Sequence, residues 1–246
     1  MLTFGQFKGF AIVNAALFCA APALAQSSLP PKGCEAFLTV QQRSCTVSHF
    51  WRCEGAPEGT TWEAVYDEDG PSSVHTYDRD FQWLDGYFFD SGISERLYEP
   101  GPDPISMSEL LGTGRDTYDF SMVELSEDGQ QITRTKGTDE FIGRLETIDG
   151  VTLRMVYVDS ETFNEEGEVI FSSHGFQYVW PEERLFFLGT DTSNNGEEAW
   201  ESDSTPVDFI FPGEKNFDRL RPVYDCGELS VRLSDPQSHI HQGAFR

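Results

Sequence analysis

Dipeptides that end in glycine and favour turns recur along this chain, with room for one β-strand between neighbours. They are Asp69-Gly70, Asp85-Gly86, Asp128-Gly129, Asp149-Gly150, Glu166-Gly167 and Asn195-Gly196. Several of them favour the positive φ angles of tight hairpin turns. Apolar residues alternate with polar ones in the segments between them, which is the pattern of strands with one buried face. We therefore expect antiparallel strands joined in sequence order.

This alternation predicts about ten or eleven strands. The segments are 45–53, 61–66, 73–81, 87–89, 118–125, 131–136, 141–147, 151–158, 169–180, 184–190 and 207–211. The fold class is then all-β, an antiparallel meander that curls into a barrel or half-barrel. A two-sheet sandwich is the alternative, but the uninterrupted run from Val151 to Glu166 suits a strongly coiled sheet better.

One short helix is expected, within a long connection over residues 99–116. Ser106-x-x-Glu109 has the spacing of a capping box and precedes two leucines. Gly112 and Gly114 should end the helix after one or two turns.

The first 25 residues have the pattern of a secretory signal peptide. Lys8 precedes an apolar stretch from Phe10 to Ala20, and Ala23-Leu24-Ala25 supplies the small residues that signal peptidase accepts. The stretch is too short to anchor the chain by spanning a bilayer. We expect a signal peptide over 1–25, a flexible segment over 26–33, a single β domain over 34–233 and a flexible polar tail over 234–246. The mature protein is then periplasmic or extracellular, with no transmembrane anchor.

The chain is strongly acidic, with 42 Asp and Glu against 17 Lys and Arg and a formal charge of −25. Binding to phosphate backbones and to anionic lipid headgroups depends on basic side chains, so nucleic acid is not an expected partner. Solubility of an exported protein explains this acidity. A cationic partner such as Ca²⁺ or a basic protein is the alternative.

Four cysteines remain after removal of the signal peptide: Cys34, Cys45, Cys53 and Cys226. An even number in an exported chain predicts two structural disulfides, and the lack of a C-x-x-C pair argues against zinc or redox chemistry. If residues 34–53 form a hairpin, Cys34 lies opposite Cys53 and Cys45 can reach Cys226. If residues 34–41 form a short helix instead, this symmetry is lost, so the pairing stays open.

The local signatures of the best-known hydrolases, metalloproteases and nucleotide binders do not occur in the sequence. Ser172-Ser173-His174 does not make a nucleophile and base pair, because neighbouring residues of a strand point to opposite faces. His239-x-His241 has the spacing of two metal ligands on one side of a strand, but no third ligand is close by. We assign no catalytic residue, no metal site and no cofactor, although distant residues can still converge on a catalytic site.

Asp191-x-Ser193-x-Asn195-Gly196 resembles the first half of a calcium-binding loop. Oxygen ligands stand at positions one, three and five, and glycine stands at six. Ser202 occupies the position of the closing bidentate glutamate, and no helix is expected on either side. We therefore expect weak Ca²⁺ binding at most.

Aromatic residues make up 13% of the chain. Several strands carry rings on both faces, so each must be covered twice or must line a cavity on one face. Core packing explains most of these rings, but a curved sheet with an aromatic concave side also forms an apolar ligand site. The candidate ligand-binding residues are Trp62, Trp83, Phe171, Tyr178 and Trp180, with Gln177 and Val179 on the outward side.

Three functional classes follow from these features. The first is a non-enzymatic binding or carrier module for an apolar small molecule or lipid. The second is an envelope protein that binds another protein through its sheet edge or acidic surface, and the third is a hydrolase whose site is built from residues far apart in sequence. The layout resembles lipoprotein-carrier half-barrels and lipocalin-like calyces at the level of the fold alone, and no residue diagnostic of either is present.

Overall fold

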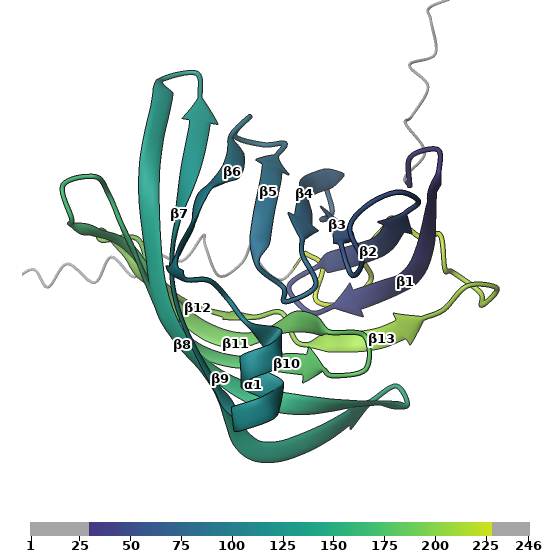
Figure 1. The fold of residues 1–246 in the computed structure, drawn as a ribbon. Coiled ribbons are helices and arrows are strands. Elements are labelled where there is room, and N and C mark those ends of the chain that lie inside the picture. Colours follow the sequence, from purple (N-terminus) through teal and green to yellow (C-terminus); the bar gives the residue numbers. More distant parts are fainter. Residues whose placement is uncertain (1–29, 228–246) are drawn as a thin grey trace, which may run out of the picture.

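Thirteen strands in one antiparallel sheet and one helix make up the fold (Figure 1). The computed structural model describes residues 30–227, without the side chains of residues 99 and 100. The elements are β1 (Cys34–Gln42), β2 (Thr46–Cys53), β3 (Thr61–Tyr66), β4 (Pro71–Tyr77), β5 (Trp83–Phe88), β6 (Ser94–Asp103), α1 (Met107–Thr113), β7 (Arg115–Ser126), β8 (Gly129–Ile148), β9 (Val151–Phe163), β10 (Val169–Trp180), β11 (Leu185–Asn194), β12 (Ala199–Asp203) and β13 (Pro206–Ile210).

The described residues leave out parts of the chain for which the sequence made predictions. The expected signal peptide over 1–25, the first half of the segment 26–33, the end of the domain 34–233 and the tail 234–246 all lie outside them. The pair His239 and His241 lies outside them as well.

The order of the strands requires the sheet to curl. Strands β1 to β12 pair in sequence order, and β13 pairs with β1 on the side away from β2, so β12 and β13 form opposite edges. Only Ser204 and Thr205 connect these edges. A chain of that length spans about 11 Å at most. The amide of Ser204 donates to the Gly189 carbonyl in β11, and Thr205 accepts from the amide of Arg43 after β1. The two edges therefore converge at this connection.

The predicted fold class is confirmed: the chain forms an all-β, antiparallel, curled half-barrel, with two strands more than the upper predicted number. Strands β1, β6 and β12 are not among the predicted segments. The predicted strands 131–136 and 141–147 are one strand, β8, whose pairing with β9 shifts between Phe141 and Leu145. Asp85-Gly86 is not a turn. It lies inside β5, where Gly86 pairs with His75.

The helix begins where the sequence predicts and ends at the second of the two predicted glycines, Gly114, whereas Gly112 lies inside it. The side chain of Ser106 accepts a hydrogen bond from the amide of Glu109, and Gly114 ends α1 in the left-handed conformation with φ 88°. Met107 and Leu110 are fully buried. They pack against a patch of valines on β9 and β10, formed by Val156, Val158 and Val179. The helix thus covers one end of the curled sheet.

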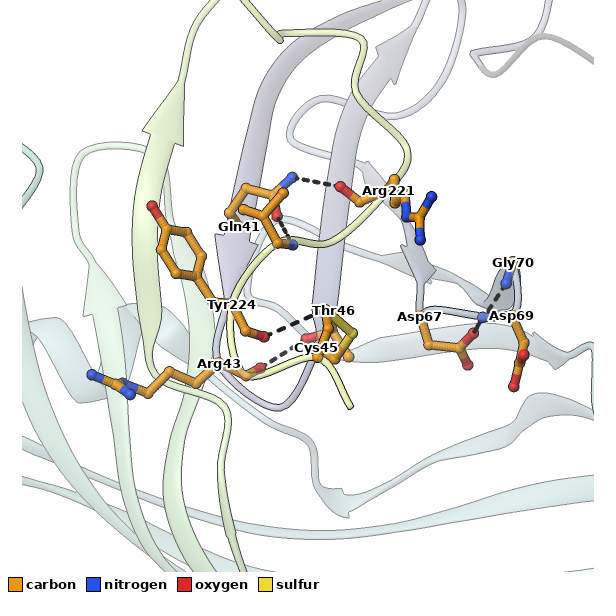
Figure 2. The surroundings of a disulfide bond; sticks show 11 residues. Gln41, Arg43, Cys45, Thr46, Asp67, Asp69, Gly70, Arg221 and Tyr224 are labelled. Atoms are coloured by element: carbon orange, nitrogen blue, oxygen red, sulfur yellow. Dashed lines mark hydrogen bonds between the residues drawn. A yellow bond between two sulfur atoms is a disulfide. The ribbon is translucent and has the colours of Figure 1, made fainter. Parts of the chain in front are cut away.

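Two disulfides hold the amino-terminal hairpin, and they match the hairpin alternative for residues 34–53. Cys34 pairs with Cys53 across β1 and β2, and Cys45 in the turn pairs with Cys226. The carboxy-terminal segment that carries Cys226 runs back over one face of β1 (Figure 2). There the Gln41 side chain donates to the Arg221 carbonyl at 3.3 Å and accepts from the Val223 amide at 3.1 Å. These contacts explain why Gln41 is 1% exposed.

The largest apolar cluster joins the two ends of the curled sheet. It combines Leu38, Val40 and Phe50 of β1 and β2 with Phe209 of β13 and with residues of β9, β10 and β11. Phe187 of β11 contacts Phe50 and Phe209 edge-to-face, with ring centroids 5.9 and 5.2 Å away. Burial of this cluster holds the curl in place.

Candidate functional site

The curled sheet forms a cavity of about 460 Å³, which we call the main cavity. Cross-strand pairing places its wall residues on one face: Tyr118 lies opposite Gly137, Gly137 opposite Ser160, and Ser160 opposite Ser173. Aromatic and aliphatic side chains form most of the wall: Tyr77, Phe81, Trp83, Ile105, Tyr118, Phe120, Val158, Phe171, Phe186 and Leu188. This volume falls in the range of small-molecule sites.

A second cavity of about 340 Å³ adjoins the main one. Six residues line both: Tyr77, Phe81, Trp83, Gln177, Phe186 and Leu188. The rings of Tyr77 and Phe81 are stacked, and the ring centroids of Phe81 and Phe186 are 5.2 Å apart. These three rings form a partition between the cavities.

Phe81 is held in the partition by an unusual backbone conformation. Its φ is +66°, in the left-handed region that non-glycine residues rarely adopt. The carboxylate of Asp78 accepts from the amides of Asp80 and Gln82 and so fixes the turn between β4 and β5. Asp80 in turn forms a 2.6 Å ion pair with Arg184, which is 23% exposed. The turn is therefore tied to the connection between β10 and β11.

Gly137 makes room for the Tyr118 ring. A Cβ atom at Gly137 would lie 2.3 Å from the Tyr118 hydroxyl oxygen, far below van der Waals contact. The ring can lie over β8 only because its partner residue has no side chain. Gly86 likewise makes room for the rings of His75 and Trp83. A Cβ atom at Gly86 would lie 2.9 Å from His75 Nδ1 and 3.0 Å from Trp83 Nε1.

Two carboxyl groups lie opposite each other near the start of α1, and one of them, Asp139, lines the main cavity. Asp116 of β7 pairs with Asp139 of β8, and they are 1% and 5% exposed. Burial, together with the charge of Asp116, raises the pKa of Asp139 to about 7, although a hydrogen bond with Tyr118 opposes this. Burial raises the pKa of Asp116 to about 6, against a hydrogen bond from the Ser106 amide. Near pH 7 this pair therefore retains a substantial share of its protons.

Asp191 also lines the main cavity, and serine hydroxyls surround its carboxylate. Its oxygens accept from Ser193 at 2.6 Å, from Ser173 at 3.3 Å and from Ser202. Asp191 and Ser193 lie within strand β11 and not in a calcium-type loop. Ser202, at the position of the missing closing glutamate, instead donates to Asp191.

The second cavity contains a Glu and His pair. Glu63 of β3 lies opposite His75 of β4, and the Tyr77 hydroxyl donates to Glu63 at 3.2 Å. Burial raises the pKa of Glu63, although hydrogen bonds from Ser48 and Tyr77 oppose this. Burial lowers the pKa of His75 to about 4, so this imidazole is neutral at pH 7. Its Nε2 lies 2.8 Å from the Ser73 hydroxyl.

The structure brings together two of the five predicted ligand-binding residues. Trp83 and Phe171 line the main cavity. Trp62 lies opposite Trp51 and packs in a cluster with Ala64 and Tyr66 on the other face of β3.

The other two, Tyr178 and Trp180, pack in the large cluster between β10, β1 and β13. Gln177, which the sequence assigned to the outward side, lines both cavities instead. Along β10, Phe171 and Gln177 therefore line the main cavity, whereas Tyr178 and Trp180 lie on the other face.

Asp116, Asp139 and Phe81 are not among the candidate site residues that the sequence predicts. In β7, the buried residues stand at every second position: 116, 118 and 120. This alternation could have placed Asp116 on the same face as Tyr118. The pairing of Asp116 with Asp139 needs the register of β7 and β8, which local sequence does not give.

The apolar wall of the main cavity suits the binding of an apolar molecule. In the second cavity, the Ser73 hydroxyl lies 2.8 Å from His75 Nε2, so a hydroxyl and an imidazole are within hydrogen-bond distance there. Ser173 lines the main cavity, whereas its neighbour His174 is exposed on the other face and lines an outer groove. No group of three or more His, Cys, Asp or Glu residues within 30–227 has an arrangement that could hold a metal ion. In the same range, no helix has the length and apolar character needed to cross a membrane.

We compared the chain with protein families, curated proteins and solved structures. No family model, no curated protein and no solved structure matches the chain.

Proposed function

We propose that this protein is a non-enzymatic binding or carrier module for an apolar small molecule or lipid, which it holds in the main cavity. The observation that supports this most is the wall of aromatic rings around a volume of about 460 Å³. Sites for small molecules are concave and mostly apolar, with a few polar groups that orient the ligand. Asp139, Asp191 and the serines of β9 to β12 would be those polar groups.

The proposed location is the periplasm or the extracellular space. Two disulfides, Cys34–Cys53 and Cys45–Cys226, support it, because such bonds persist in oxidising compartments. The predicted signal peptide points the same way.

Uptake of a neutral apolar dye tests the proposed function. N-phenyl-1-naphthylamine should become fluorescent on mixing with the purified protein, and native mass spectrometry of gently purified protein should show a copurifying apolar molecule. Phe171→Ala should weaken dye binding because Phe171 lines the main cavity. Phe89→Ala is the matched control, since Phe89 is 44% exposed and lines neither cavity. A protein with no dye uptake and no copurifying molecule would contradict the proposal and favour an interaction module.

A further inference from the structure

The side chains of the main cavity that can carry a charge are all acidic. Within the described part of the chain, two carboxyl groups, Asp139 and Asp191, line this cavity, and no lysine, arginine or histidine does. The whole chain carries a formal charge of −25. An anionic ligand such as a fatty acid would therefore bring its carboxylate into a field of like charge.

The two carboxylates differ in how far their hydrogen bonds are satisfied. Asp191 accepts from Ser173, Ser193 and Ser202. Asp139 is 5% exposed, and its buried Oδ1 has no hydrogen-bond partner among residues 30–227. Buried polar atoms are nearly always paired in native proteins, so an unpaired oxygen on a residue that lines the cavity suggests a donor that arrives with a ligand.

The groups around Asp139 also favour a cation. Asp116 lies directly opposite on β7, and it too has a buried Oδ1 without a partner among the described residues. Tyr118 and Phe120 follow Asp116 at alternate positions of β7, and both line the main cavity. The faces of aromatic rings attract organic cations, which adds to the attraction of the carboxylates.

We propose that the occupant of the main cavity is an apolar molecule with a protonated amine, whose N–H group donates to Asp139 while its apolar part lies against the aromatic wall. This inference rests on the proposed function and narrows its ligand class to cationic amphiphiles or apolar amines. A hydrogen bond between a buried carboxylate and an ammonium group is among the strongest that proteins form.

Three ligands of equal chain length test the charge of the head group. Dodecylamine, 1-dodecanol and dodecanoate should each be titrated, below their aggregation concentrations and at pH 8, against protein loaded with N-phenyl-1-naphthylamine. Dodecylamine should bind about tenfold or more tightly than dodecanol, because a charge-assisted hydrogen bond adds at least that factor. Dodecanoate should bind most weakly.

Asp139→Asn removes the charge and keeps the shape of the side chain. It should abolish the preference for dodecylamine and leave dodecanol binding unchanged. Asp159→Asn is the matched control, because Asp159 is an exposed residue of the adjacent strand β9 and does not line the cavity. It should keep the preference. If Asp139→Asn does not fold, the wild-type series alone still decides the question.

Two kinds of failure are distinguishable. Dodecanol or dodecanoate binding as tightly as dodecylamine, or a preference that survives in Asp139→Asn, would overturn the inference and leave the cavity function intact. Binding of the dye without displacement by any of the three ligands would overturn the inference alone. Failure of the dye to bind, together with no copurifying molecule, would overturn the proposed function and this inference with it.

Discussion

Tyr77 and Phe81 stack with their ring centroids 4.1 Å apart and their planes 8° from parallel. Tyr77 ends β4 and Phe81 lies in the turn that follows, so this contact is local in sequence. Both residues nevertheless line both cavities. The Tyr77 hydroxyl also donates to Glu63, so the same residue takes part in the partition and in the polar lining of the second cavity. The stack thus lies between the two cavities.

Phe81→Ala should merge the two cavities. The loss of a partly buried ring should lower the free energy of unfolding by about 2 kcal/mol, less than for a fully buried phenylalanine. The variant should take up neutral dyes larger than those that bind the wild-type protein, measured by fluorescence titration, while Phe89→Ala should not. A variant that loses stability without any change in dye capacity would show that the rings do not separate the cavities.

The stability of the protein should fall as the pH rises through about 7, and Asp139 should contribute to this. Burial raises the pKa of Asp139 to about 7 from an ordinary value of 3.8, so the folded state holds a proton that the unfolded state has lost. The stabilisation is complete below about pH 4 and is lost as the pH rises through the folded pKa. A pKa difference of this size between the folded and unfolded states corresponds to at most about 4 kcal/mol.

Asp139→Asn tests this dependence, because asparagine does not titrate. From pH 4.5 to 8, the variant should gain stability relative to the wild type by about 2–4 kcal/mol, measured by urea unfolding. The groups that also affect this region are Asp116 and Tyr118 of β7, Ser160 and Asp159 of β9, Glu109 of α1 and Asp103 of β6. Asp128→Asn serves as the control, because Asp128 is exposed in the turn between β7 and β8. A constant difference between variant and wild type would refute the raised pKa.

Gly137→Ala should destabilise the protein through its contact with Tyr118. The new Cβ would overlap the ring, which would have to leave its place in the cavity wall. In a Tyr118→Ala background the same glycine substitution should cost much less. A double-mutant cycle by chemical denaturation measures this coupling, and we expect at least about 1 kcal/mol. Additive costs would mean that the backbone at Gly137, and not the ring, requires glycine.

The disulfide between Cys45 and Cys226 should stabilise the fold more than the one between Cys34 and Cys53. The paired cysteines are 181 and 19 residues apart. The chain-entropy model then gives about 5 and about 3 kcal/mol. Paired serine substitutions, compared by urea unfolding, test this order. Thiol titration of the denatured, unreduced wild-type mature protein should find no free thiol, and two or more free thiols would contradict the presence of two disulfides.

Local patterns predict a large part of the fold. The N-cap side chain of Ser106 and the left-handed Gly114 set the limits of α1, because both act within a single helix turn. The other half of the predicted capping box is not formed, since the Ser106 amide donates to Asp116. The predicted phase of β3 is also confirmed, since Trp62, Ala64 and Tyr66 share a face. The same pattern does not show that this face lies away from the cavities.

Local sequence does not show which residues contact side chains on another strand. Gly86 looks like part of a turn, but the His75 and Trp83 rings occupy the space that a side chain there would need. The sequence made no prediction for Asp139, whereas the register of β7 and β8 places Asp116 opposite it and both are buried.

The sequence by itself determined the positions of most strands, the short helix and the supply of paired cysteines, because turn chemistry, capping and side-chain alternation act over a few residues. Tertiary structure decided that β13 pairs with β1, which way the sheet curls, and which face of each strand lines the cavities. These features depend on contacts such as Val40 with Phe209, far apart in the chain. Their free energy comes from burial between segments that no local pattern brings together.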